Sequence, residues 1–140
     1  MTTNLFPFGV RMTDPQDIAR MTQVQLTALN QTAGTIPANI ITGGDSVFCI
    51  TTNATPGTQT TRTAVQMFAD DPTAYPGQAY VLRIANSGAG TLTLAGGSGV
   101  TVTGTATVAT NTFRDFVVQY GGTAAAPTVT ITNVGLGTYT

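Results

Sequence analysis

The 140-residue chain has few side chains that could carry out chemistry. It contains one cysteine, Cys49, three serines, and no histidine, lysine, glutamate or tryptophan. A nucleophilic Ser or Cys needs a neighbouring base, which is most often His. Cys49 lies in the apolar run of residues 46–51, so we expect a buried, unreactive thiol. The residue types predict that the protein is not an enzyme and has no catalytic residues.

The acidic residues are the remaining candidates for acid–base catalysis or metal binding. All six are Asp, and only Asp70 and Asp71 are adjacent. Adjacent side chains in an extended segment point apart, and Pro72 follows, so we expect this pair to end a helix. No loop has the alternating oxygen ligands that Ca²⁺ requires. The glycine-rich residues 96–99 join two predicted strands, whereas a phosphate-binding loop leads into a helix. We expect neither a metal nor a cofactor.

The surface is predicted to be neutral and rich in hydroxyl groups. Charged residues make up 8% of the chain, against about 25% in an ordinary domain. There are 30 Thr, and the net charge is −1. No cluster of basic residues could neutralise phosphates, and no apolar run approaches the length of a membrane span, so neither nucleic acid nor a membrane is an expected partner. Residues 1–10 do not resemble a signal peptide, so synthesis in a cytoplasm is expected.

Three charged residues follow Pro72, namely Arg83, Arg114 and Asp115. Because charges are so rare here, each is expected to have a partner. Arg forms planar two-point pairs and tolerates interfaces better than Lys does. The three residues therefore predict a contact between subunits, and the alternative is that they are exposed at a sheet edge.

Alternating patterns after residue 44 predict the elements that hold these residues. Residues 47–52 have the pattern of a strand, and residues 62–69 that of a short helix. Five further strands follow between residues 80 and 134, separated by Gly-rich turns about every ten residues. This spacing predicts an all-β domain over residues 45–140, an antiparallel β-sandwich with one solvent-exposed face. Gly104, within the predicted strand of residues 100–108, predicts a bend.

The first 44 residues are predicted to form an arm, a helix and a connector. In the arm, residues 1–12, Pro7 interrupts an apolar run and argues against both a helix and a central strand. Asp14 and Pro15 suit the start of a helix, and residues 18–29 carry an imperfect helical stripe. Gly34 and Pro37 mark the connector.

The strands resemble a β-domain of tailed-phage virion proteins. Four segments carry the resemblance: residues 77–86, 90–105, 113–116 and 129–135. Within residues 62–135, about half of the chain, the texture is similar to capsid decoration (cement) proteins and to head-fibre or tail-fibre modules. The resemblance implies a jelly-roll-like trimer on the outside of the head, with the major capsid protein as partner. It implies no catalytic residues.

Three hypotheses about function remain open at this point. The first is a capsid decoration protein, synthesised in the host cytoplasm, that reinforces contacts between shell subunits. The second is a trimeric fibre or adhesin module that binds a host glycan or protein, which exposed aromatic residues such as Tyr75 or Tyr139 would favour. The third is an ice-binding protein, because of its Thr-x-Thr rows. Those rows are unevenly spaced, which argues against a solenoid, and Thr is a good strand former on any solvated face.

Association is predicted because so little charge leaves surfaces and edges poorly protected. We expect a closed homo-oligomer, most simply a trimer. The apolar side chains Leu5, Phe6 and Phe8 should not remain in water, since burying each one is worth about 1.5–3 kcal/mol. We expect the arm to contact a neighbouring subunit or the shell, because the predicted helix separates it from the sheet. The alternative is an arm folded back on its own domain.

Overall fold

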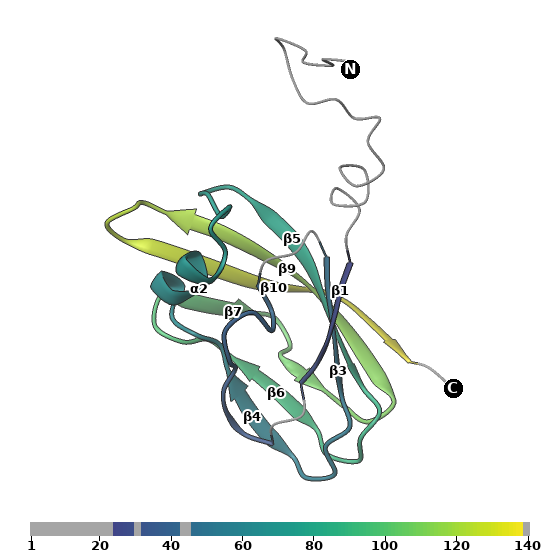
Figure 1. Cartoon of the computed structure of the whole chain (residues 1–140). Helices are drawn as coiled ribbons and strands as arrows, with labels where there is room; N and C mark the ends of the chain where they lie inside the picture. Colours follow the sequence, from purple (N-terminus) through teal and green to yellow (C-terminus); the bar gives the residue numbers. More distant parts are fainter. Residues whose placement is uncertain (1–23, 30–31, 43–45, 139–140) are drawn as a thin grey trace, which may run out of the picture.

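A computed structural model describes residues 24–29, 32–42 and 46–138 as two sheets that pack face to face, with one short helix at one end (Figure 1). The six-stranded sheet has, in spatial order, β1 (Val24–Ala28), β3 (Ser46–Thr51), β5 (Ala79–Asn86), β9 (Thr112–Gly122), β10 (Pro127–Thr138) and β7 (Val100–Thr103). The four-stranded sheet has β2 (Gly34–Thr35), β4 (Gly57–Thr60), β6 (Leu92–Ala95) and β8 (Thr107–Val108). The predicted all-β class is confirmed, and a jelly-roll order is not.

Both sheets are mixed, so the predicted antiparallel arrangement is wrong. Strands β1, β3 and β5 run parallel to one another, as do β2, β4 and β6, and β7 runs parallel to β10. The pairs β5–β9, β9–β10 and β6–β8 are antiparallel. Alternation of side chains shows which residues face the core, but the connections decide strand direction. Here each of the first connections passes through the other sheet before it returns.

The first six strands alternate between the two sheets, so the chain winds through successive turns that each place one strand in each sheet. Val24 is aligned with Ser46, and Ser46 with Val81, so successive turns are 22 and 35 residues long. The longer turn contains the helix α2 (Ala64–Asp70), which lies between β4 and β5. Uneven spacing therefore did not exclude stacked parallel turns, because one turn accommodates an inserted helix.

The second half of the helix predicted over residues 18–29 is a strand. Residues 24–28 form β1, whose backbone pairs with β3, and the hydroxyl of Thr27 donates to the carbonyl oxygen of Ile40 at 3.1 Å. Tertiary pairing overrides a weak helical stripe. Residues 18–23 and the arm lie outside the described residues. The division of the chain at residue 44 stays a prediction, but β1 and β2 already add a strand to each sheet.

The bend predicted at Gly104 divides the strand predicted over residues 100–108. Gly104 has a φ of +82°, a conformation that side chains rarely allow. The chain leaves the six-stranded sheet after β7 and enters the four-stranded sheet at β8. The predicted single strand is thus two strands in different sheets.

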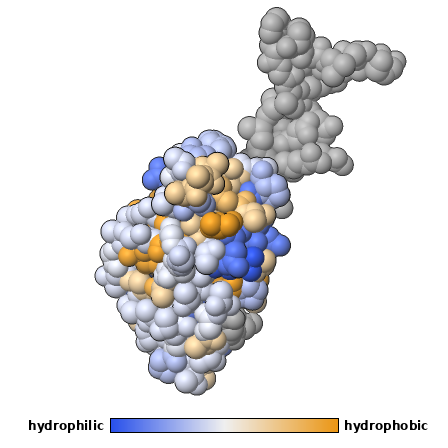
Figure 2. Space-filling view, turned by 90° about the vertical axis from the view of Figure 1, so that its left-hand side faces the viewer, coloured by the Kyte–Doolittle hydropathy of each residue, from blue (hydrophilic) through white to orange (hydrophobic). Residues whose placement is uncertain are grey.

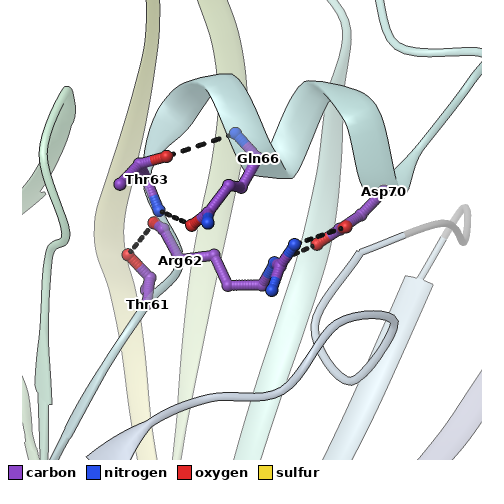
Figure 3. Close-up of polar contacts among 5 residues, drawn as sticks. All are labelled: Thr61, Arg62, Thr63, Gln66 and Asp70. Carbon is purple, nitrogen blue, oxygen red and sulfur yellow. Dashed lines mark hydrogen bonds and ion pairs between the residues drawn. The ribbon is translucent and has the colours of Figure 1, made fainter.

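The short helix α2 forms where residues 62–69 predict it. Thr63 accepts a hydrogen bond from the backbone N–H of Gln66, and the Gln66 side chain accepts one from the N–H of Thr63, a capping box (Figure 3). Arg62 forms an ion pair with Asp70 at 2.7 Å, and Asp71 ends the helix as predicted. In the described part of the chain, no helix is long and apolar enough to span a membrane.

A pair of tyrosines lies in the core beneath α2. Tyr80 donates a hydrogen bond to the carbonyl oxygen of Ile41, and its ring centroid is 6.1 Å from that of Tyr120. Phe68 of α2 meets the Tyr120 ring edge to face at 4.8 Å. Burial is the main cause that raises the pKa of both phenols, with the Asp71 carboxylate adding to it, and the pKa of Tyr120 rises to about 12.

Because of these tyrosines, we expect the folded protein to lose stability at alkaline pH. An unfolded Tyr titrates near pH 10, so above that pH the unfolded chain releases a proton that the folded chain keeps. The free energy of unfolding should then fall by up to about 1.4 kcal/mol per pH unit for each buried tyrosine. Tyr120→Phe keeps the ring, and urea unfolding between about pH 9 and 11.5 should show a shallower decline than the wild type. An unchanged decline would contradict this origin.

Candidate functional site

The six-stranded sheet has one face that no described element covers. Side chains alternate along each strand, and aligned residues of neighbouring strands share a face, so the outer side chains follow from the register. On β1, β3, β5 and β9 they are mostly apolar: Leu26, Phe48, Ile50, Val81, Ala85, Phe113 and Val117. We call these residues the apolar half. Leu26 is 74% exposed, and Val81 is 42% exposed.

The predicted residues Arg83 and Asp115 lie together in the middle of the apolar half. They are directly opposite each other on β5 and β9. The Arg83 Nε donates to Asp115 Oδ1 at 2.7 Å, and Nη2 donates to Oδ2 at 2.8 Å. These hydrogen bonds are the main cause that raises the pKa of Arg83. The expectation that Arg83 has a partner is confirmed, and its strand is internal to the sheet rather than an edge.

Two aromatic rings flank the Arg83 guanidinium. Its central carbon is 4.1 Å from the ring centroid of Phe113 and 5.4 Å from that of Phe48. The Phe113 ring lies over Gly137, where an added Cβ would be only 2.1 Å from the ring. The glycine thus leaves room for the ring. A planar guanidinium suits this two-point, stacked arrangement in a way that an ammonium group does not.

Other predicted site residues lie elsewhere or outside the described residues. The Arg114 Nε donates to the carbonyl oxygen of Thr107, so this residue joins β9 to β8 and is not part of the Arg83 cluster. Leu5, Phe6 and Phe8 are outside the described residues. Phe48 and Phe113 are not among the residues predicted for this site. The signal was present in β3, where Phe48 and Ile50 alternate with the buried Val47 and Cys49, which makes both faces of the strand apolar.

The rest of the outer face is a row of threonines, which we call the Thr half. Thr130 and Thr132 on β10 are aligned with Thr101 and Thr103 on β7. Cross-strand Thr pairs stabilise a solvated sheet by about 0.2–1 kcal/mol each. The outer face is therefore divided into an apolar half that carries one ion pair and an uncharged half that carries hydroxyl groups.

The cysteine and the Asp70–Asp71 pair are buried or form contacts within the fold. Cys49 is buried, and burial raises the pKa of its thiol, as expected for an unreactive cysteine. Asp70 faces Arg62, whereas Asp71 accepts hydrogen bonds from the backbone and side chain of Thr73. No group of three or more potential metal ligands occurs among the residues that the structure describes.

A second surface feature is a groove at the α2 end of the molecule. Its volume is about 600 Å³, and it is lined by Val65, Phe68, Ala74, Tyr75, Pro76, Thr123, Ala124, Ala125 and Pro127. We call it the α2 groove. Tyr75 is 60% exposed and Val65 is 63% exposed. Figure 2 views the side of the molecule that carries α2, where apolar (orange) residues gather on an otherwise pale surface and adjoin a hydrophilic (blue) cluster. The groove residues come from three separate segments, which is why no local sequence pattern predicted the groove.

Comparison with known proteins adds no assignment to these surfaces. No protein-family model matches the chain, and no curated protein or solved structure matches it either.

Proposed function

We propose that this protein is a structural component of a tailed-phage virion. In this proposal it is a decoration protein that binds the outer surface of the head and reinforces contacts between major capsid subunits. It acts as a homotrimer in which the outer face of the six-stranded sheet makes the contact between protomers. The observation that carries the proposal is the uncovered apolar half, with the Arg83–Asp115 pair at its centre.

The outer face has the chemistry of a protein contact and an area at the lower end of the usual range. Six strands spaced about 4.8 Å apart and roughly six residues long give a flat area of about 600 Å². A standard interface buries about 800 Å² per partner. The cores of such interfaces are depleted in charged residues and enriched in aromatic residues and Arg, as the apolar half is. Joining three copies multiplies weak shell contacts through multivalency, so no single strong site is needed.

The α2 groove favours one alternative function. An exposed Tyr75 beside Pro76 and Val65 is a surface on which a host glycan or protein could bind. A fibre or adhesin module would use such a groove, whereas a decoration protein would not need it. Ice binding has less support than the fibre function. Thr101 and Thr103 on β7 are aligned with Thr130 and Thr132 on β10, but this row of threonines spans only these two strands. Thermal hysteresis in solution would support that function.

Two measurements test the proposal. Light scattering of the purified protein should report about three times 14.3 kDa, and a clean monomer would contradict the trimer. Cryo-electron microscopy of the particle should place the chain on the outside of the head. Density at the tail or in a fibre would support the alternative, and absence of the chain from the particle would contradict both virion functions.

A further inference from the structure

The α2 groove lies at the end of the molecule where the described chain begins. Val24, the first residue of β1, is aligned through Ser46 with Val81 of β5. Tyr75 and Pro76 precede β5, and Gln119, aligned with Ala79, leads into the hairpin loop that forms another wall of the groove. The start of β1, the loop before β5 and the hairpin loop are therefore at the same end of the six-stranded sheet.

The arm is joined to β1 at the same end of the sheet as the α2 groove. A contact with another subunit was expected because the helix predicted over residues 18–29 would separate the arm from the sheet, but β1 takes the place of the second half of that helix. Four strand spacings separate β1 from β10, or about 19 Å. The residues between Phe8 and Val24 can span about 50 Å when extended. The apolar part of the arm can therefore reach the groove of its own copy.

The chemistry of the groove matches that segment. The groove is lined by aliphatic, aromatic and proline side chains with a single threonine, Thr123, and by no charged residue. Residues 5–8 read Leu-Phe-Pro-Phe and carry no charge. Proline-containing segments bind to grooves lined by aromatic residues in other proteins because their extended conformation loses little entropy. The tether also gives the segment an effective concentration on the order of millimolar.

We infer that residues 5–8 of each chain bind in the α2 groove of the same copy. The contact is independent of the proposed function, because the proposed protomer contact uses the outer face of the six-stranded sheet and the groove lies elsewhere. The arm then covers Val65 and Tyr75, which are more than half exposed in the described residues alone. Peptides or glycans could bind there only by displacing it.

A tryptophan in the arm reports on this contact. The chain has four Tyr and no Trp, so Phe6→Trp introduces a single tryptophan, which is excited selectively at wavelengths that Tyr does not absorb. Its emission should be blue-shifted and protected from acrylamide quenching. Adding Val65→Asp, an exposed position in the first turn of α2 where an acidic residue is well tolerated, should abolish both effects. Val134→Asp is the matched control, since Val134 is 60% exposed and does not line the groove, and it should leave the emission unchanged.

Three outcomes would overturn the inference. Solvent-like emission from Phe6→Trp alone would show that the arm is not docked. Blue-shifted emission that survives Val65→Asp would place the arm on another surface. The third outcome concerns which copy is bound: the double variant is unfolded and refolded with an excess of wild-type chain, whose groove is intact. Recovery of the blue shift would mean that the arm binds a neighbouring copy, whereas binding within one copy predicts no recovery.

Discussion

Replacing Asn86 by alanine should lower the free energy of unfolding by about 3–5 kcal/mol, because three buried backbone groups lose a partner. Asn86 is fully buried at the end of β5. Its Nδ2 donates to the carbonyl oxygens of Gly90 and Val108 at 2.8 and 2.9 Å, and its Oδ1 accepts from the N–H of Gly88 at 2.9 Å. The loss is a large fraction of the about 5–15 kcal/mol that stabilises an ordinary domain.

The position of Asn86 explains why its hydrogen bonds matter so much. The turn after β5 stacks on the turn after β3. The backbone N–H of Ser87 donates to the carbonyl oxygen of Thr51 at 3.0 Å, and the N–H of Gly90 donates to the carbonyl oxygen of Asn53 at 2.9 Å. A Cβ at Gly88 would be 2.1 Å from the carbonyl oxygen of Asn53, so the two turns touch backbone to backbone. The hydrogen bonds of Asn86 to Gly88 and Gly90 hold the turn after β5 in the conformation that this contact requires.

Two further variants separate hydrogen bonding from packing. Asn86→Leu fills most of the space but makes no hydrogen bond, so it should be as destabilising as alanine. Ala89→Ser changes an exposed neighbour in the same turn whose side chain makes no hydrogen bond, and it should alter stability by no more than about 0.5 kcal/mol. Urea unfolding monitored by circular dichroism gives all three values. A loss below about 1 kcal/mol for Asn86→Ala, or rescue by leucine, would contradict the role of its hydrogen bonds.

The sequence predicted elements with a clear period and missed those set by distant contacts. The alternation of apolar and polar residues, together with the Gly-rich turns between them, located β3, β5, β6, β9 and β10. The strands β2 and β8 are two residues long, too short for any period to be read, and the four residues of β4, Gly-Thr-Gln-Thr, include no apolar side chain. In β1, a helical stripe and a strand pattern overlapped, and pairing with β3 decided between them. Strand direction depends on connections, which local patterns do not encode.

The candidate site could be predicted only in part for the same reason. Scarcity of charge indicated that Arg83 had a partner, and Asp115 became that partner through the β5–β9 register, which links residues 32 positions apart. Phe48 flanks the pair because β3 lies beside β5. Local patterns describe single strands, whereas the cluster is made by three strands in a particular order.

Replacing Leu26 by aspartate should weaken association of the protomers more than a hundredfold if the outer face is the contact. Leu26 is 74% exposed on the edge strand β1, so the isolated protomer should keep its stability within about 0.5 kcal/mol. In the assembled trimer the new carboxylate would be buried without a partner, which costs about 3–5 kcal/mol. Each 1.4 kcal/mol is about a tenfold change in a dissociation constant. Sedimentation equilibrium over a dilution series measures this change.

The matched control is Thr130→Asp, which places the same charge on the same face but on the Thr half. Thr130 is exposed on β10 and is aligned with Thr101 on β7, so neighbouring hydroxyl groups can donate hydrogen bonds to the new carboxylate even when the outer face is covered. This variant should therefore weaken association far less. Equal weakening by both variants would show that added charge, rather than the apolar half, is responsible. A Leu26→Asp protein that still forms trimers would remove the apolar half from the contact. The Arg83–Asp115 pair would then be an ion pair that joins β5 to β9 within one protomer, because its two hydrogen bonds pair the two charges without any partner chain.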